Sequence, residues 1–326
     1  MNDVRWGLLS TANINKALIP AIRASERGEL VAVASRSEER AAAYAREWDI
    51  PQAFGSYESM LESGAVNAVY VSLPNNLHAE WSIRAMENGV HVLCEKPFAL
   101  TLQEVDAMID AAETTGCVLA EAFMYRHHPQ MKQVGAWVRE GRLGEVMGVR
   151  ATFNFAFRSR DNIRLDPQLG GGCLWDVGVY PLSFAQYIMG GPPRWVVGDQ
   201  WLGDTGVDEF FMGQMHYAGG RTAQIMSAFR TPFYTMAEVV GTEGRLLLDR
   251  PFTRVEEGSI TFFPADGEPE TTHPPQKNLY LGEVEDMHDA ILDSEPLYLS
   301  LTETRNHVRT VLALYESAEK QRVVQL

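Results

Sequence analysis

Cysteine is scarce in this chain: its 326 residues include only Cys94, Cys117 and Cys173, and none of them forms a C-x-x-C pair. An odd number of widely spaced cysteines fits neither a disulfide framework nor a zinc ribbon, so we expect reduced and mostly buried thiols. The motifs H-E-x-x-H and G-x-S-x-G are also absent, and His127 and His128 are adjacent instead of one helical turn apart. Zinc hydrolysis, serine hydrolysis and a bound metal therefore have no support.

Positive charge is also in short supply. The 28 lysines and arginines are outnumbered by 43 aspartates and glutamates, which gives a formal net charge of −15, and no Lys/Arg-rich stripe interrupts this excess. A nucleic-acid backbone would be repelled, so we exclude nucleic acid as a partner. The longest apolar runs, such as residues 68–73, are far shorter than the roughly 20 residues that span a bilayer. Without a secretory signal pattern, the chain is expected to be cytoplasmic and to have no membrane contact.

The rest of the composition is that of an ordinary globular protein, with 45% hydrophobic and 22% charged residues. The length predicts two domains. In the first, apolar runs at 4–9, 29–35, 68–73, 90–94 and 118–121 alternate with amphipathic helical patterns. Such alternation requires a parallel sheet covered on both faces, so residues 1–122 are predicted to form a doubly wound α/β Rossmann domain.

The pattern changes in residues 123–326. After a helix at 129–140, strand-like runs at 146–157, 195–201, 210–217, 222–229 and 259–263 are separated by turns, with one strong helix at 176–189. Glycine-rich turns favour antiparallel hairpins. We predict a C-terminal α+β domain on a large, mostly antiparallel open sheet, followed by helices at 283–292 and 302–320.

The turn between the first strand and the first helix is the expected nucleotide site. In an open parallel sheet, phosphate groups bind there because exposed amides and the positive end of the helix dipole favour negative charge. The G-x-G-x-x-G motif is absent, but small residues in its place still permit close approach of a pyrophosphate. A tight turn without any ligand would use the same residues. The predicted cofactor-binding residues of this turn are Ser10, Thr11, Ala12, Asn13 and Ile14.

The end of the second predicted strand indicates which dinucleotide binds. It carries Ser35 and Arg36, where a cofactor with a free ribose 2′-hydroxyl would require an Asp or Glu. A hydroxyl and a guanidinium suit a 2′-phosphate instead, and Arg40 follows one helical turn later. The sequence therefore predicts NADP(H) as the preferred cofactor, with NAD(H) as the alternative. The alternative is that both arginines are solvated surface charges.

Two further motifs contain candidate catalytic residues. Lys96 lies in Glu95-Lys96-Pro97, directly after a predicted strand and at the sheet edge where ligands bind. Asp176 and Tyr180 are four residues apart, so they share one face if their segment is helical. The alternatives are a surface lysine, an aspartate that caps a helix and a tyrosine in the core.

Residues around the second motif have less specific roles. Pro181 would interrupt an established helix, so its segment is expected to be a first turn or to be kinked there. Arg164 is expected to form a loop salt bridge in preference to a substrate contact. Phe153, Phe155 and Phe157 alternate with smaller residues, which is typical of a core or an oligomer interface.

Five segments in this order resemble the Gfo/Idh/MocA oxidoreductases along nearly the whole chain. They are the S-T-A-N-I turn, S-L-P-N-N-L-H at 72–78, E-K-P at 95–97, E-A-F-M-Y-R-H-H-P-Q at 121–130, and N-I-R followed by G-G-G-C-L-W-D-V-G-V-Y between 162 and 180. The chain is most similar to the branch with dimeric dihydrodiol dehydrogenase, glucose-fructose oxidoreductase and NADP-dependent xylose dehydrogenases. In that branch, a tyrosine follows the aspartate by four residues.

The resemblance implies a Rossmann domain followed by a substrate-binding sheet domain that assembles homodimers or homotetramers. It also implies that Tyr180 is the acid/base, that Lys96 bridges the substrate hydroxyl and the cofactor, and that Asp176 holds the sugar or diol. One departure is the serine- and alanine-containing turn that replaces the glycine-rich turn of many members. The other residues implied to bind the cofactor are Leu73, Pro74, Asn75, His78, Glu95 and Arg126.

These residues suit a hydride-transfer reaction. Oxidation of an alcohol carbon requires a base for the hydroxyl proton, while a nicotinamide cofactor carries the hydride. A tyrosine with a pKa of about 10 is a poor base at neutral pH unless a nearby ammonium, here that of Lys96, favours the phenolate. We therefore predict an NADP(H)-dependent oxidoreductase acting on a sugar or cyclic diol. The alternatives are a nicotinamide-retaining glycosidase on the same scaffold and a non-enzymatic dinucleotide-sensing regulator, which would have no need of both Lys96 and Tyr180.

Overall fold

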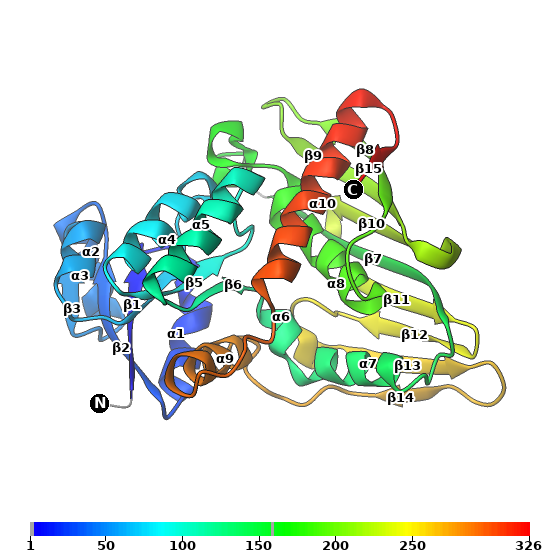
Figure 1. Ribbon diagram of the computed structural model, residues 1–326, viewed down its shortest axis with the longest axis horizontal. Helices are drawn as coiled ribbons and strands as arrows, with labels where there is room; N and C mark the ends of the chain where they lie inside the picture. Colours follow the sequence, from blue (N-terminus) through cyan, green and yellow to red (C-terminus); the bar gives the residue numbers. More distant parts are fainter. Residues whose placement is uncertain (1–2, 158–159) are drawn as a thin grey trace. The chain divides into compact units, whose positions relative to one another are not determined.

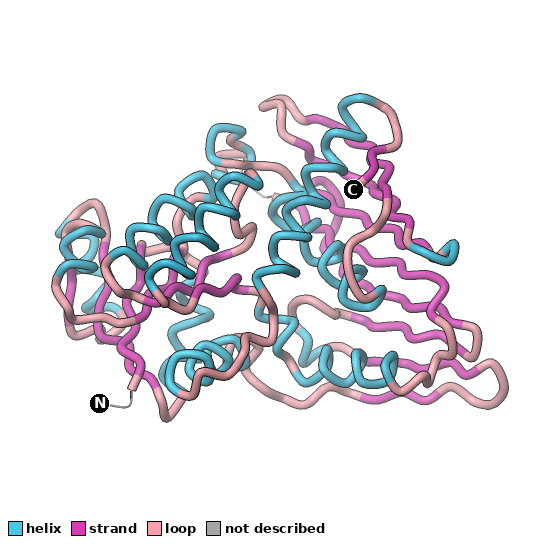
Figure 2. The backbone as a smooth tube through the Cα atoms, in the orientation of Figure 1, coloured by secondary structure: helices cyan, strands magenta, loops and turns pink. Residues whose placement is uncertain are grey.

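The computed structural model describes residues 3–157 and 160–326. These residues form two compact units (Figure 1, Figure 2). Unit 1 comprises the described residues up to His127 together with Asn278–Thr304. Unit 2 comprises His128–Lys277 and Arg305–Leu326, as far as they are described.

Unit 1 is built on a six-stranded sheet in the order β3-β2-β1-β4-β5-β6, in which every neighbouring pair is parallel. The strand order reverses between β1 and β4, and ligands of open parallel sheets bind beyond the carboxyl ends at such a point. The predicted doubly wound α/β domain is confirmed. The elements are β1 (Val4–Leu9), α1 (Asn15–Ala24), β2 (Gly28–Ala34), α2 (Glu38–Glu47), β3 (Gln52–Phe54), α3 (Tyr57–Glu62), β4 (Ala68–Val71), α4 (His78–Glu87), β5 (His91–Glu95), α5 (Leu102–Thr115), β6 (Leu119–Ala122) and α6 (Met124–His127).

Local sequence explains where helix α5 starts and stops. The Thr101 hydroxyl accepts a hydrogen bond from the Glu104 N–H (3.1 Å), and the Glu104 carboxylate accepts one from the Thr101 N–H (3.0 Å). Gly116 ends the helix at φ 70°, a left-handed conformation that glycine adopts without strain. An N-cap of this kind stabilises a helix by about 1 kcal/mol. Both ends of α5 are therefore fixed by local residues of its own segment.

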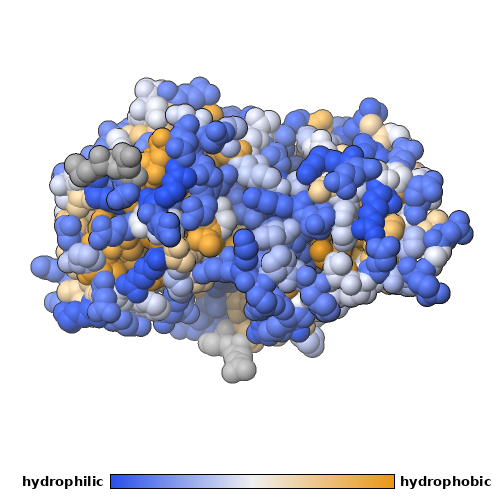
Figure 3. Space-filling model, turned by 90° about the horizontal axis from the view of Figure 1, so that it is seen from below, coloured by the Kyte–Doolittle hydropathy of each residue, from blue (hydrophilic) through white to orange (hydrophobic). Residues whose placement is uncertain are grey.

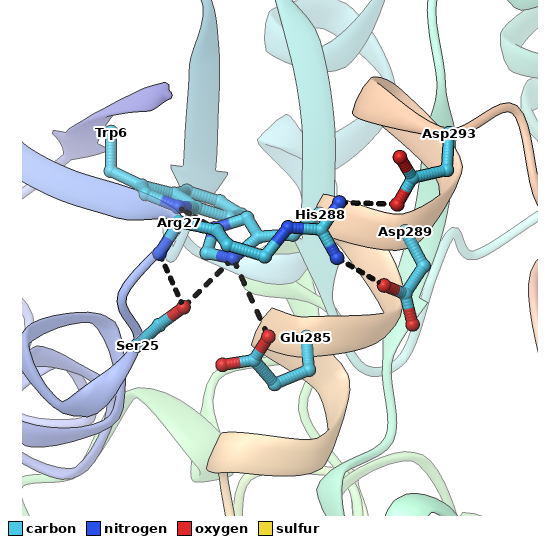
Figure 4. Close-up of polar contacts among 7 residues, drawn as sticks. All are labelled: Trp6, Ser25, Arg27, Glu285, His288, Asp289 and Asp293. Atoms are coloured by element: carbon cyan, nitrogen blue, oxygen red, sulfur yellow. Dashed lines mark hydrogen bonds and ion pairs between the residues drawn. The ribbon is translucent and has the colours of Figure 1, made fainter. Parts of the chain in front are cut away.

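Helix α9 (Leu281–Leu292) joins unit 1 through a buried histidine (Figure 4). His288 is 0% exposed; its Nε2 accepts a hydrogen bond from the Trp6 indole (2.9 Å), and its Nδ1 lies 3.0 Å from Ser25 Oγ. Because Nε2 is an acceptor, the neutral ring carries its proton on Nδ1 and donates it to Ser25. Arg27 adds ion pairs to Asp289 of this helix and to Asp293 at its C-cap.

The position of residues 278–304 in unit 1 differs from the predicted division into residues 1–122 and 123–326. The physical reason is that α9 packs against α1, β1 and α6, and that its residues Val284 and Met287 are 0% exposed in the core of the Rossmann sheet. A helix at 283–292 is evident from its periodicity. No local pattern indicates which sheet that helix covers.

Unit 2 is built on a nine-stranded sheet in the order β14-β13-β12-β11-β7-β10-β9-β8-β15. The β7 and β10 strands are parallel and the other pairs are antiparallel, which confirms the predicted mostly antiparallel sheet. Helix α8 packs on β7 and β10. The elements are α7 (Pro129–Arg139), β7 (Val146–Ala156), α8 (Val179–Met189), β8 (Trp195–Leu202), β9 (Asp208–His216), β10 (Thr222–Ala228), β11 (Arg230–Gly241), β12 (Gly244–Asp249), β13 (Ser259–Pro264), β14 (Glu270–Thr272), β15 (Val324–Gln325) and α10 (Leu301–Lys320), whose first turn belongs to unit 1.

The strand-like runs expected from the sequence do not include β11 and β12, which pair with each other. A register shift between Arg230 and Tyr234 interrupts the pairing of β11 with β7. Regular burial begins only later, where Ala237 and Val239 are 0% exposed. The period-2 signal of the strand is therefore hidden in its first half.

Surface hydropathy, the exposure of the thiols and the apolar character of the helices bear on what the protein can bind. Hydrophilic residues cover most of the face drawn in Figure 3, with smaller hydrophobic patches between them. Cys94 and Cys173 are buried, Cys117 is partly exposed, and all three are free thiols. Within the described residues, no helix combines the length and apolar character needed to cross a bilayer.

Candidate functional site

The turn after β1 contains a backbone conformation that glycine usually adopts. Ser10 has a φ of 130°, in the region that glycine normally occupies. Its Oγ lies 3.0 Å from the Ser72 carbonyl oxygen and accepts a hydrogen bond from the Ala12 N–H (3.0 Å). Its carbonyl oxygen accepts a hydrogen bond from the Asn15 amide (2.9 Å). Side chains of this turn and of the loop after β4 therefore support the strained conformation.

The first turn of α1 suits an anion. Its N-cap residue, Ile14, makes no side-chain cap bond, and the turn contains Lys16 and no acidic residue. Amide groups at a helix start, with the positive end of the helix dipole, attract phosphate. Thr11 and Ala12 are half-buried and Asn13 is exposed. The predicted residues 10–14 thus fit the pyrophosphate of a dinucleotide.

Ser35, Arg36 and Arg40 lie together beyond the carboxyl end of β2. Ser35 is buried, and its Oγ accepts a hydrogen bond from the Ser37 N–H (3.4 Å) at the start of α2. Burial raises the pKa of the Tyr57 phenol, and Arg36 and Arg40 both oppose that shift. The two exposed guanidinium groups are therefore both close enough to Tyr57 to act on its charge. Within residues 3–157 and 160–326, no carboxylate forms an ion pair with either arginine. This arrangement suits an anionic ligand such as a 2′-phosphate.

The segment after β4 contains four predicted cofactor residues. Pro74 and Asn75 are partly exposed, whereas Leu73 is 8% and His78 1% exposed. The His78 ring lies between two backbone carbonyl oxygens, with Nδ1 2.8 Å from that of Pro97 and Nε2 2.9 Å from that of Leu73. Burial lowers the pKa of His78, and these carbonyls oppose the shift. His78 therefore ties the loop after β4 to the loop after β5.

Lys96 directly follows β5 at the carboxyl edge of the sheet, as predicted. Its neighbour Glu95 accepts a short hydrogen bond from Tyr70 on β4. Burial raises the pKa of Tyr70, and Glu95 raises it further. Glu283, at the start of α9, is 2% exposed, and burial, Glu95 and Asp286 raise its pKa. The sequence pattern indicates the E-K-P motif but not the buried phenol and acid that surround its glutamate.

Arg126 has an enclosed environment. Its side chain is 1% exposed and lies 3.1 Å from the Glu303 carboxylate, which is also in unit 1. The charge is thus compensated inside the unit. The predicted contact between Arg126 and a cofactor stays a prediction.

In unit 2, the glycine run at residues 170–172 leads into a helix whose first part is irregular. Leu174–Gly178 form a π-helical turn, and Val179–Met189 continue as α8. Pro181 has no N–H to donate to the carbonyl four residues earlier, which favours a wider turn at this place. Pro181 lies in the first turn of α8, which is one of the two positions expected for it.

Asp176, the predicted substrate residue, lies in this π-helical turn and is 9% exposed. Arg164 Nε lies 2.8 Å from its Oδ2, and the Asp176 N–H donates a hydrogen bond to the Gly172 carbonyl (3.1 Å). The expected salt bridge of Arg164 is confirmed, and its partner is the candidate substrate residue. The Arg164 side chain is 44% exposed, so one side of the ion pair is open to solvent.

Tyr180 lies in the first turn of α8 and is 5% exposed. Its ring centroid lies 5.3 Å from that of Phe153 and 5.8 Å from that of Phe252, and these two phenylalanines stack at an interplanar angle of 9°. Phe153 therefore belongs to the core. Aromatic pairs of this kind contribute about 0.5–1.5 kcal/mol each, so the orientation of the Tyr180 ring is set by packing.

Each unit thus carries one part of the predicted site. Unit 1 carries the β1–α1 turn, the arginines after β2 and Lys96; unit 2 carries Asp176 and Tyr180 on consecutive turns of one helix.

Asp208 is a residue that the sequence pattern does not single out, and its carboxylate accepts a hydrogen bond from the Leu174 N–H (2.8 Å). A detectable signal is the Asp208-Glu209 pair at the start of a strand, because acidic residues are depleted in strands.

Family models match both parts of the chain. The model of the oxidoreductase family with an NAD-binding Rossmann fold matches residues 4–123, and that of the GFO/IDH/MocA C-terminal domain matches residues 131–247. D-xylose 1-dehydrogenase (NADP(+)) 2 of Haloferax volcanii is 40% identical over 98% of this chain and 99% of its own. Trans-1,2-dihydrobenzene-1,2-diol dehydrogenase of Xenopus tropicalis is 30% identical over 74% of this chain and 73% of its own.

A solved structure extends these similarities. KijD10, a 3-ketoreductase from Actinomadura kijaniata in complex with NADP and TDP-benzene, is 29% identical, with a TM-score of 0.90 over 97% of this chain and 98% of its own. Solved variants of KijD10 replace a lysine by alanine or a tyrosine by phenylalanine. The resemblance inferred from the five sequence segments is confirmed. The chain belongs to the Gfo/Idh/MocA family and is an NAD(P)-dependent oxidoreductase.

Proposed function

We propose that this protein is an NADP(H)-dependent dehydrogenase or reductase that transfers a hydride between the nicotinamide and a sugar or cyclic diol. The observation that carries the proposal is the 40% identity, over almost the full length of both chains, to an NADP(+)-dependent D-xylose 1-dehydrogenase. The environment of Ser35, Arg36 and Arg40 supports NADP(H) as the preferred cofactor, with NAD(H) as a weaker ligand. Unit 1 would hold the dinucleotide, and unit 2 would provide most of the substrate contacts.

Residue spacing supports Lys96 and Tyr180 as the catalytic pair. The lysine and the tyrosine that are replaced in the solved KijD10 variants are 84 positions apart. The same separation lies between Lys96 and Tyr180 in this chain. Both KijD10 variants hold TDP-benzene and NADP, which fits residues chosen for their part in the reaction.

The proposed chemistry assigns one proton-transfer role to each residue. A bound nicotinamide would supply the hydride acceptor or donor, which no side chain provides. The Tyr180 phenolate takes the hydroxyl proton during oxidation, and the phenol returns it to the developing alkoxide during reduction. The Lys96 ammonium favours the phenolate and stabilises negative charge on the substrate oxygen.

Asp176 has a substrate-holding role in this proposal. A carboxylate accepts hydrogen bonds from substrate hydroxyl groups, and the ion pair with Arg164 orients the Asp176 carboxylate. Arg164, whose side chain is partly exposed, would then also be available to a substrate oxygen. The choice among sugars and diols would then depend on the hydroxyl pattern that fits Asp176.

A substrate panel tests the proposal. The purified protein is incubated with NADP⁺ or NAD⁺ and a set of aldoses, polyols and cyclic diols, and net formation of reduced nicotinamide is followed by absorbance. We expect net reduction of NADP⁺ with at least one aldose or diol. Sugar cleavage without a net change in the cofactor would instead identify a nicotinamide-retaining glycosidase. Cofactor binding with neither reaction would identify a dinucleotide-sensing regulator.

The sheet of unit 2 supports a homo-oligomer. One row of the strand register contains Trp201, Phe210, Ala228, Asn154 and Tyr234, and Met212 follows Phe210 on the same face. Trp201, Met212 and Tyr234 are 46%, 51% and 51% exposed. We expect a dimer or tetramer in sedimentation experiments and its dissociation by Met212→Glu. A wild-type protein that sediments as a monomer at micromolar concentration would refute this part of the proposal.

A further inference from the structure

Asp208, the first residue of β9, is a buried carboxylate surrounded by three donors. It is 2% exposed; its Oδ2 accepts hydrogen bonds from the Leu174 N–H (2.8 Å) and the Cys173 thiol (3.0 Å), and its Oδ1 accepts one from the Tyr315 hydroxyl of α10 (2.8 Å). Hydrogen bonds of this kind stabilise the ionised form of a carboxyl group. Neither the cofactor nor the proposed proton transfer uses these contacts.

The contacts of Asp208 converge on the segment that carries Asp176. Leu174 opens the π-helical turn, and the Asp176 N–H is bonded to the Gly172 carbonyl. Gly172 has a φ of 128°, and a Cβ atom added there would lie 2.1 Å from Asp208 Oδ1. Both the backbone conformation and the nearby carboxylate therefore require glycine at position 172. Asp208, Gly172 and Leu174 together fix where the turn begins.

We propose that Asp208 is a positioning residue, whose ionised carboxylate holds the start of the Leu174–Gly178 turn and thereby places Asp176 and Tyr180 for the reaction. The catalytic part of this proposal rests on the proposed function, whereas the tether itself does not. Uptake of a proton removes the charge and one acceptor site, and charge-assisted hydrogen bonds are about twice as strong as neutral ones. The tether therefore weakens when Asp208 is protonated.

The surroundings of Asp208 bring this protonation into an accessible pH range. Burial raises the pKa of Asp208 to about 6, and the hydrogen bonds from Cys173, Leu174 and Tyr315 oppose that shift. The other titratable groups that face it are the Cys173 thiol and the Tyr315 phenol, whose pKa values are raised mainly by burial, and both stay neutral at this pH. Asp176 acts on the same thiol. Activity should thus fall as the pH drops through about 6.

Asp208→Asn is the primary test, because asparagine has nearly the same shape and mimics the protonated acid at every pH. We expect kcat near neutral pH to fall by between about tenfold and a hundredfold, the cost of a small misplacement of reacting groups. The Kd for NADP⁺, which reports on unit 1, should stay within about twofold of the wild-type value. The acid limb of the kcat profile near pH 6 should disappear. A variant that keeps this limb unchanged would overturn the proposal.

Tyr315→Phe provides a second variant in case Asp208→Asn does not fold. It removes one hydrogen bond to the ionised carboxylate, so it should raise the pKa of Asp208 and move the acid limb upward by about one pH unit. Glu209→Gln is the matched control: it changes the next buried carboxylate of β9, whose pKa is lowered by Arg160 and Arg230. This control should lower thermal stability without moving the acid limb. An unmoved limb in Tyr315→Phe would contradict the proposal.

Hydrogen exchange separates the tether from the proposed function. In the wild-type protein, protection of the Leu174 and Asp176 amides, corrected for intrinsic exchange rates, should decrease as the pH falls through about 6, because the carboxylate is then protonated. Asp208→Asn should show low protection at every pH. This result is expected even if no sugar or diol proves to be a substrate. Protection that is independent of pH in the wild-type protein would refute the tether directly.

Discussion

Replacing Arg36 and Arg40 by alanine should abolish the preference for NADP⁺ over NAD⁺. Both guanidinium groups are exposed beyond β2, and neither has a carboxylate partner in the described part of the chain. A hydrogen bond to a charged group contributes about 1.5 kcal/mol or more, so two arginines on a 2′-phosphate contribute about 3 kcal/mol. At about 1.4 kcal/mol per factor of ten, the Kd for NADP⁺ should rise about a hundredfold. If only one arginine contacts the phosphate, the expected rise in Kd is about tenfold.

Calorimetric titration of the R36A/R40A variant with NADP⁺ and with NAD⁺ measures the effect. The Kd for NAD⁺ should change by less than about twofold, because NAD⁺ has no 2′-phosphate to lose contact with. Arg46→Ala is the matched control, since Arg46 is an exposed arginine in the last turn of α2, the helix that contains Arg40. If both nucleotides lose affinity equally, or if Arg46→Ala has the same effect, the arginines act through general electrostatics or folding and the selectivity argument is wrong.

Two further predictions concern stability and substrate binding. Burial lowers the pKa of His288, so the stability that the neutral ring gives the folded protein is present above the ordinary pKa of about 6.5 and is lost as the pH falls below it. His288→Gln should therefore reduce the decrease in melting temperature between about pH 7.5 and about pH 5.5. An unchanged decrease would count against the Trp6–His288–Ser25 network. Arg164→Gln should raise the substrate KM about fivefold, since a partly exposed ion pair contributes about 1 kcal/mol, and leave the Kd for NADP⁺ unchanged; an unaltered KM in steady-state kinetics would mean that the pair does not position Asp176.

Much of unit 1 could be predicted because its signals are local. The Thr101–Glu104 capping pattern and Gly116 fix α5, and alternation of strands with helices determines the parallel sheet. The conformation of Ser10 could not be predicted, because a positive φ at a serine depends on hydrogen bonds to Ser72 and Asn15, whose proximity exists only in the folded chain. The location of α9 is hidden for the same reason, since the Trp6–His288 contact joins residues 282 positions apart.

The candidate site shows the same division between local and long-range information. Lys96, Asp176 and Tyr180 stand in motifs with recognisable spacing, so the sequence alone indicates them. The partners that hold such residues come from other elements: Asp208 from β9 binds the start of the turn that contains Asp176, and Phe252 packs against Tyr180. No window of sequence around Tyr180 contains that information.

The central claim is that the Tyr180 phenol is the acid/base of a nicotinamide-dependent oxidation or reduction. Single-turnover kinetics of Tyr180→Phe, with Tyr187→Phe of the same helix as control, test it most directly once a substrate is identified. Loss of a positioned acid/base lowers the rate of the chemical step by about 10²–10⁴-fold, so we predict such a loss in Tyr180→Phe, with the Kd for NADPH unchanged and Tyr187→Phe close to wild type. A chemical step that proceeds at the wild-type rate without the Tyr180 hydroxyl would contradict the claim.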